Sequence, residues 1–293
     1  MIRKPIRIVV KSLAVIVALA VIAAGAVVWR LYLGPVDAEF AARHVRAELA
    51  RSFPDLTIGL GTTEAVWPGD MSGLPLRSRD LRLTGKDGGE VAHFPEVVMT
   101  IALLPLLTGQ LRLEAIRFVR PEIALERDGR GNIALRTGAS QSNGQDRLFA
   151  MMIGRMAGRP ADAEPLGRLQ SIEIVDGNVT LSDRPTGQVW RADSLRSALR
   201  RRPEGLAAEV SFALRTGGKA ARIGGEAVYR KDDGRIAGAL TFEGLYPAVL
   251  AAVSDSLSAL DNLQVPLSGR ISFASSDDGR FQSGVLDIAG GAG

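Results

Sequence analysis

The chain has 293 residues, of which 46% are hydrophobic and 5% aromatic, and it contains no cysteine. This length accommodates one or two domains with cores of their own. The lack of cysteine excludes disulfides, thiolate metal sites and cysteine nucleophiles. The formal net charge of +4 belongs to the N-terminus, because five bases and no acid stand in the first 30 residues, leaving 31 of the 36 bases against 32 acids. A body of nearly balanced charge has no electrostatic footprint for nucleic acid.

The first 33 residues predict a membrane anchor. Residues 1–11 form a basic tail, and residues 12–33 are almost entirely apolar and long enough to span a bilayer. Four bases precede the apolar run, which places the N-terminus in the cytoplasm and the rest of the chain outside. The alternative is a cleaved signal peptide, because Ala24-Gly25-Ala26 resembles a cleavage site. The run continues through Val27, Val28 and Trp29, which favours the anchor.

A second helix is predicted after Gly34-Pro35, with Asp37 as its N-cap and its end near Arg51. Its apolar stripe includes Phe40, Val45 and Leu49. We expect this helix to cap the open end of a sheet; the alternative is that it lies on the membrane surface.

From Leu56 onward the pattern is typical of β-strands. Leu81 and Leu83 alternate with polar neighbours, residues 86–89 predict a turn, and Val91 begins a strand that Pro95 interrupts. The most apolar stretch outside the anchor is 97–104, which predicts a strand with one face formed by alternate residues. That face comprises Val97, Met99, Ile101 and Leu103.

One strand segment occurs twice, 56 residues apart and without gaps. The first copy is IRFVRPEIALERDGRGNIAL from Ile116, and the second is IEIVDGNVTLSDRPTGQVWR from Ile172. Both alternate apolar and polar residues with period two, and both change phase just before Pro121 or Gly177. A phase change of this kind predicts a bulge or bend. A repeated β unit extends a sheet by addition.

Between and after these copies the chain alternates loose and ordered stretches. Residues 137–168 predict a linker containing a short amphipathic helix at 147–158, and a second β region begins at Leu169. Turns are predicted at 216–218, 232–234 and 277–279, and a helix is predicted after Pro247. The strand near Leu286 is followed only by glycine and alanine, which predicts that the natural polypeptide continues past Gly293.

The sequence contains no combination of residues typical of a catalytic or metal-binding site. His44 and His93 are the only histidines, too few for a triad or a multi-histidine metal site, and both are interpreted as structural. Gly59 and Gly61 lack the context of a dinucleotide loop. We therefore predict no catalytic, cofactor-binding or metal-binding residue and no enzymatic activity. What remains is apolar surface carried by strands, which either fills a sandwich core or lines an open trough for acyl chains.

The order of these elements resembles the AsmA-like family of Gram-negative bacteria, which includes YhdP and TamB. The resemblance rests on PEVVMTIALLPLLTGQLRLEAIRFVRPEIALERDGRGNIAL from Pro95, and on SIEIVDGNVTLSD, GQVWRADSL and LTFEGLYPAVLA further on. It implies a mainly β protein: a transmembrane helix, a capping helix and an elongated, curved antiparallel β-groove with a few short helices. The groove would comprise a first segment within 34–136 and a second within 169–293.

The resemblance also implies a function. We expect a bridge-like lipid-transfer protein of the inner membrane, with its body in the periplasm, that handles phospholipid between inner and outer membranes and supports outer-membrane integrity. Its partners would be membrane lipids and other envelope proteins, without nucleic acid or cofactors. The alternative is a non-lipid scaffold or assembly factor for outer-membrane proteins that acts through β-edge pairing. The residues expected to contact acyl chains are Val97, Met99, Ile101, Leu103, Phe118, Ile123, Leu125, Ile174, Val179 and Leu181.

Overall fold

The structure is a computed structural model that describes ten ranges and several single residues. The ranges are 36–39, 56–66, 73–85, 90–103, 112–128, 133–135, 167–216, 218–247, 265–275 and 281–290, and the single residues are 29, 30, 33, 34, 43, 46, 105, 156 and 158. The basic tail, most of the predicted anchor, and most of the three other predicted helices lie outside these residues. Within the described part, no helix has both the length and the apolar character needed to cross a membrane.

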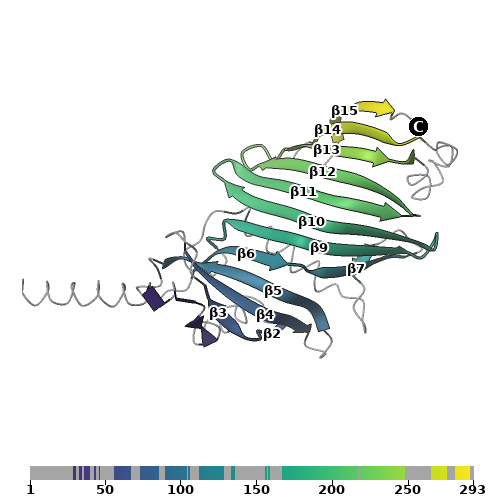
Figure 1. Ribbon diagram of the computed structural model, residues 1–293. Helices are drawn as coiled ribbons and strands as arrows, with labels where there is room; N and C mark the ends of the chain where they lie inside the picture. The colour runs from purple at the N-terminus through teal and green to yellow at the C-terminus, as the bar shows by residue number, and fades with distance from the viewer. Residues whose placement is uncertain are drawn as a thin grey trace, which may run out of the picture.

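Fifteen strands form one open, curved sheet (Figure 1). Along the main path the order is β1-β3-β4-β5-β6-β9, followed by β10 to β15 in sequence, while β2 pairs with β4, and β8 with β7. The strands are β1 Val36–Asp37, β2 Leu56–Gly59, β3 Thr63–Ala65, β4 Leu74–Gly85, β5 Glu90–Ile101, β6 Leu113–Val119, β7 Glu122–Arg127, β8 Ile133–Leu135, β9 Ser171–Asp183, β10 Gln188–Arg202, β11 Gly205–Thr216, β12 Lys219–Arg230, β13 Ile236–Leu245, β14 Leu267–Ser275 and β15 Phe281–Gly290. The predicted β class is confirmed, and both predicted groove segments contribute to this one sheet.

From β9 to β15 each strand pairs antiparallel with the next. Two of the predicted turns connect such strands: Gly218, with a φ of 77°, lies between β11 and β12, and the backbone N–H of Arg230 donates to Arg235 O at 2.9 Å beside the turn after β12. The predicted turn at 277–279 lies outside the described residues, but β14 and β15 pair on either side of it.

The two copies of the repeated strand lie side by side and parallel, which corrects the expectation of an all-antiparallel groove. Ile116 pairs with Ile172, Phe118 with Ile174, and Leu125 with Leu181. These are the same pairs that a gapless alignment of the copies gives. The first copy is split into β6 and β7, and both of these strands pair with the single strand β9. The chain between the copies therefore returns to the end where β6 begins, as a parallel connection requires.

The bend predicted in both copies is present at equivalent positions. Arg120 and Asp176 are 56 residues apart and both adopt left-handed backbone conformations, with φ of 50° and 53°. The N–H of Arg120 donates to Val175 O at 2.8 Å, and that of Asn178 donates to Pro121 O at 2.9 Å, so hydrogen bonding resumes on both sides of the bend. Pro121 is buried, and a Cβ on Gly177 would lie only 3.2 Å from its Cγ. The bends of the two copies therefore nest against each other.

Several strand boundaries differ from the prediction. β5 runs without interruption through Pro95 and ends at Ile101, so Leu103 lies beyond the strand to which the pattern assigned it. Pro95 lies opposite Asp80, a left-handed residue with φ of 59°, and the register continues unchanged on both sides, with Arg79 paired to Glu96 and Leu81 to Phe94. β8 was not predicted, because three residues are too short for a periodic signal.

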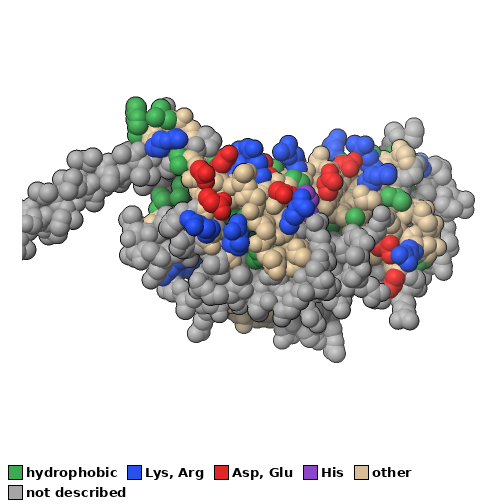
Figure 2. All heavy atoms as spheres, turned by 90° about the horizontal axis from the view of Figure 1, so that it is seen from below, with side chains coloured by type: hydrophobic (Ala, Val, Ile, Leu, Met, Phe, Trp, Pro, Cys, Tyr) green, Lys and Arg blue, Asp and Glu red, His purple; other side chains and the backbone are tan. Residues whose placement is uncertain are grey.

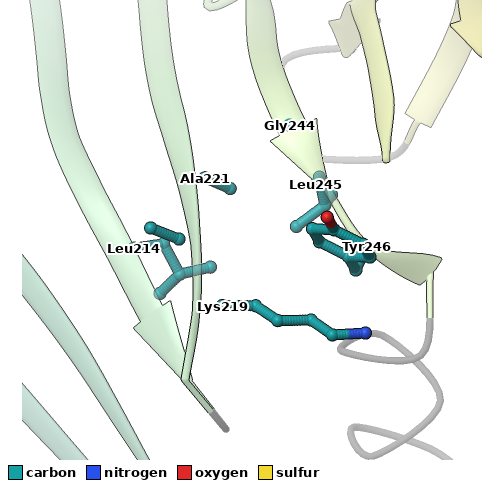
Figure 3. Close-up of a pocket in the computed structure, with 7 residues that line it drawn as sticks. Leu214, Lys219, Ala221, Gly244, Leu245 and Tyr246 are labelled. Carbon is teal, nitrogen blue, oxygen red and sulfur yellow. The ribbon is translucent and has the colours of Figure 1, made fainter. Parts of the chain in front are cut away.

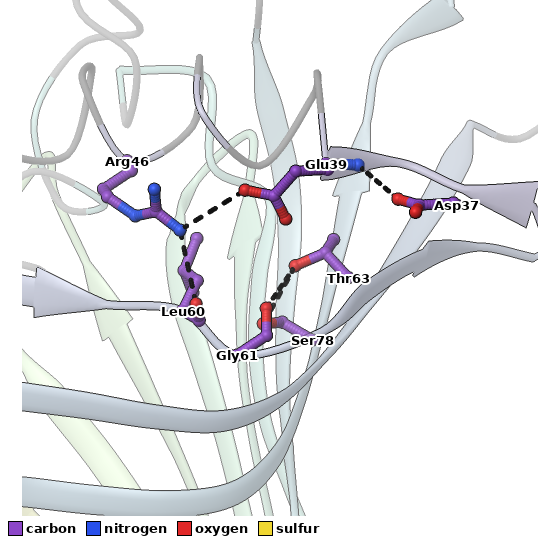
Figure 4. Close-up of polar contacts among 7 residues, drawn as sticks. All are labelled: Asp37, Glu39, Arg46, Leu60, Gly61, Thr63 and Ser78. Carbon is purple, nitrogen blue, oxygen red and sulfur yellow. Dashed lines mark hydrogen bonds and ion pairs between the residues drawn. The ribbon is translucent and has the colours of Figure 1, made fainter.

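The region of the predicted capping helix is described only in part. Asp37 lies in β1, and its Oδ1 accepts a hydrogen bond from the backbone N–H of Glu39 at 2.9 Å, the kind of contact made by an N-cap (Figure 4). Arg46 donates to Leu60 O at 3.2 Å and lies 3.9 Å from Glu39 (Figure 4). These contacts hold Glu39 and Arg46 beside the first strands of the sheet.

Candidate functional site

The strand register gives the sheet one apolar and one polar face. Directly opposed residues share a face, so the row that begins at Leu206 continues through Tyr229 to Ile236, and the row that begins at Phe212 continues through Ile223 and Phe242. In β11 to β15 this apolar face consists almost wholly of aliphatic, aromatic and glycine residues. Its larger members are Leu206, Val210, Phe212, Leu214, Ile223, Tyr229, Ile236, Leu240, Phe242, Leu267, Ile271, Phe273, Leu286 and Ile288.

The opposite face is polar and carries cross-strand ion pairs. Arg117 pairs with Glu173 at 2.9 Å, Arg222 with Glu243 at 2.9 Å, and Arg270 with Glu226 at 2.6 Å. Figure 2 shows charged side chains gathered along one side of the molecule. Most of these pairs are exposed, so each contributes at most about 1 kcal/mol to stability. Their main consequence is the segregation of charge from the apolar face.

Four of the predicted lipid-contacting residues lie in the buried core. Val97, Met99, Ile101 and Phe118 are each less than 8% exposed, and Met99 is only 2% exposed. The centroids of the Phe118 and Phe94 rings are 4.5 Å apart. Residues from outside these strands, including Met156 and Leu169, belong to the same buried cluster. We call this region, the apolar face of β4, β5 and β6, the closed end.

Five further predicted residues lie on the same face where β6 and β7 pair with β9, which we call the repeat junction. Ile123 pairs with Val179, and Leu125 with Leu181, and all four are half-buried, as is Ile174. The parallel pairing of β7 and β9 therefore brings equivalent residues of the two copies into adjacent positions. Leu103 is half-buried beyond the end of β5 and does not share that row.

The apolar face is exposed at the other end of the sheet, which we call the open end. It is the apolar face of β13, β14 and β15. The exposed large hydrophobic residues described on it are Ile236 and Leu240 of β13, Ile271 of β14, and Leu286 and Ile288 of β15. Leu286 and Ile288 are 57% and 51% exposed. None of these residues was among the predicted contacts. Their signal was the apolar alternation in LTFEG, RISFA and VLDIA, which the glycines between them made inconspicuous.

A small hollow lies on the apolar face between the open end and the repeat junction (Figure 3). Leu214, Ala221, Leu245 and Tyr246 line it, and the Nζ of Lys219 lies 4.1 Å from the centroid of the Tyr246 ring. This arrangement is a cation–π contact at the end of the β11–β12 hairpin. The hollow adds apolar surface beside a cation, and Lys219 and Tyr246 are the ionisable residues that line it.

The titratable groups on the polar side form structural contacts. His93 Nε2 lies 2.6 Å from Asp80 Oδ1, and Arg82 Nε donates to the same oxygen at 3.1 Å. These hydrogen bonds, that of Arg82 first, lower the pKa of the Asp80 carboxyl. Among the described residues no three His, Cys, Asp or Glu side chains are arranged to hold a metal ion, and His44 lies outside them. The contacts of His93 tie β4 to β5 at Asp80, the left-handed residue of β4.

No family model, curated protein or solved structure matches this chain.

Proposed function

We propose that this chain is a membrane-anchored lipid-transfer protein of the bridge-like kind, which handles phospholipid between the inner and outer membranes from the periplasmic side. The observation that carries the proposal is a single apolar sheet face on which five large side chains of β13, β14 and β15 are exposed, while the opposite face carries the ion pairs. Exposed apolar patches of this kind mark interaction sites on soluble proteins.

Acyl chains suit the open end because its lining is extended, apolar and free of charge. Leu240 is directly opposite Ile271, which is directly opposite Leu286, so three exposed side chains form one transverse row. Transfer of an acyl chain onto such a row gains roughly 0.8 kcal/mol per methylene removed from water. Head groups at the margins of the sheet would remain hydrated. In this account the closed end supports the sheet, and the lipid occupies the face beyond it.

A matched pair of double variants tests the proposal. In β15, Leu286 and Ile288 lie on the apolar face, while Val285 and Ala289 lie on the polar face, and all four are exposed. We expect glycerophospholipid to be extracted from the purified full chain, and Leu286→Glu with Ile288→Glu to reduce the amount severalfold. Val285→Glu with Ala289→Glu should leave it unchanged. Equal lipid content in both variants would contradict acyl-chain binding at this face.

The edges of the sheet favour a second function, a scaffold that pairs with the strand of a partner protein. At one edge β1, β2 and β3 are only two to four residues long, whereas β15 is ten residues long and pairs only with β14 among the described strands. Short strands protect an edge, while a long exposed strand is open to pairing. Site-specific crosslinking along β15 that captures a protein and no lipid would favour this second function.

A further inference from the structure

The strand ends on the two sides of the sheet differ in charge. On the side where β6 and β9 begin, the turns next to the open sheet form what we call the basic rim: Arg168, Arg201, Arg202, Arg230, Lys231 and Arg235. Three carboxylates, those of Glu204, Asp232 and Asp233, lie in the same turns, so the net formal charge is +3.

The backbone brings the turns of the basic rim together. Arg202 is directly opposite Gly205, which is directly opposite Arg230, and the N–H of Lys231 donates to Glu204 O at 2.9 Å. On the other flank, the N–H of Arg201 donates to Gln170 O at 2.7 Å, and its Nη1 donates to Gly167 O at 3.1 Å. The cations therefore form one continuous strip along the ends of β9 to β13.

Two cations of this strip are available to a ligand. Arg230 and Arg235 share the carboxylate of Asp233, and the hydrogen bond with Asp233 raises the pKa of Arg230. Arg202 and Lys231 are exposed, and no side chain in the described part of the protein pairs with either. They lie in adjacent turns, on either side of the Gly205–Arg230 pair.

The opposite strand ends lack this surplus. At residues 126–128, 183–188 and 218–220 three cations face three carboxylates. Arg127 pairs with Asp183 at 3.2 Å, and Arg184 with Glu126 at 2.6 Å. The positive charge is therefore a property of one side of the sheet and not of strand ends in general.

The N-terminal segment leaves the sheet on the side of the basic rim. Val36 pairs with Ala65, Ala65 with Leu76, and β4 begins at Leu74, so the chain before Val36 runs toward the ends where β6 and β9 begin. The predicted anchor precedes Val36. A membrane that holds this anchor therefore faces the basic rim rather than the neutral one.

We infer that the basic rim binds the phosphate groups of anionic glycerophospholipid head groups at the membrane surface. The inference rests on the proposed function, because it requires that the chain be held at a phospholipid bilayer. Arginine and lysine bind phosphate through charge-assisted hydrogen bonds. A bilayer rich in anionic lipid attracts basic residues that lie close to it. Lipid phosphate at the rim would lie beside Leu206, Tyr229 and Ile236, where the apolar face begins.

The test compares the full chain in nanodiscs of phosphatidylcholine alone and in nanodiscs that also contain phosphatidylglycerol. We expect amide hydrogen exchange in residues 201–205 and 230–235 to slow severalfold with phosphatidylglycerol, while residues 183–188 stay unchanged. Arg202→Glu or Lys231→Glu should each reduce the protection, by roughly fivefold if each basic residue acts as those at membrane surfaces do. Arg191→Glu is the control, because Arg191 is an exposed cation of the same strand, distant from the rim.

Inorganic phosphate added to the phosphatidylcholine discs separates the two sources of this chemistry. If free phosphate slowed amide exchange at the basic rim as much as phosphatidylglycerol does, the head-group assignment would be overturned. It would also be overturned if exchange at the rim were the same in discs with and without phosphatidylglycerol. Measuring the lipid extracted from wild type and from the Leu286→Glu, Ile288→Glu variant distinguishes the two proposals. If the double variant loses lipid but phosphatidylglycerol does not slow exchange at the rim, only the head-group inference is refuted. If phosphatidylglycerol slows exchange at the rim but both proteins carry equal lipid, only acyl-chain binding is refuted.

Discussion

The closed and open ends of the sheet have the same alternation of side chains, but they differ in how far their apolar residues are exposed to solvent. At the closed end Met99 and Ile101 are 2% and 1% exposed, and at the open end Leu286 and Ile288 exceed 50%. Both pairs lie on the apolar face of one continuous sheet. The difference is the material above the face, since Met156 and Leu169 join the buried cluster only at the closed end. Alternation therefore identifies the apolar face of a strand, but it does not show whether other residues cover that face.

The largest expected effect comes from placing a charge at each end. Met99→Glu buries a carboxylate in the cluster without a partner, which we expect to destabilise the fold by more than about 4 kcal/mol or to abolish folding. Leu286→Glu leaves its charge in water and should change the free energy of unfolding by less than about 1 kcal/mol. Denaturant unfolding measures both. Similar destabilisation by the two variants would contradict the distinction between the ends.

A smaller effect is expected where the two repeat copies meet. A Cβ on Gly177 would lie 3.0 Å from Ile174 Cγ2 and 3.2 Å from Pro121 Cγ. Gly177→Val should therefore destabilise the sheet by about 1–3 kcal/mol through overpacking. Gly290→Val at the open end is the control, because no heavy atom lies within 4 Å of an added Cβ there. If both variants unfolded at the same denaturant concentration, the bends would not be nested.

The smallest effect concerns the backbone of the bend itself. Arg120 has a φ of 50°, which costs a non-glycine residue about 1–2 kcal/mol. Arg120→Gly should stabilise the protein by about 0.5–1 kcal/mol after the entropy cost of glycine. The gain from Asp176→Gly should be smaller, because aspartate tolerates this conformation better than arginine. Thermal unfolding of the two variants gives the order, and a loss of stability in Arg120→Gly would exclude relief of strain at this position.

Much of the fold was predictable because the repeat carries its own register. The gapless offset of 56 residues, the bend before Pro121 and Gly177, and the turns near 217 and 233 all follow from local pattern and turn chemistry. The parallel arrangement of the copies was not predictable, because the same alternation suits either direction. It depends on the end of the sheet to which the chain returns between Leu135 and Leu169, and neither the linker composition nor the short helix predicted there specifies that end.

The candidate site was predictable only as a face. Val97, Met99 and Ile101 were chosen because they form the most apolar alternation outside the anchor, yet this segment is the one that the core buries, with Met99 only 2% exposed. The exposed residues Leu240 and Ile271 lie in strands with glycine and serine, which lowers their mean hydropathy. Exposure is a property of tertiary packing, so the alternation of apolar residues in these strands could not predict which of them are exposed.

The central claim is that lipid lies on the apolar face and not on the polar face. Leu240 and Val228 test it most directly, because they are 38% and 40% exposed on opposite faces of neighbouring strands. With a photoreactive amino acid at position 240, irradiation of cells should give a covalent adduct with the mass of a phospholipid. The same group at position 228 should give none. Adducts of equal yield at both positions, or none at 240, would contradict the account.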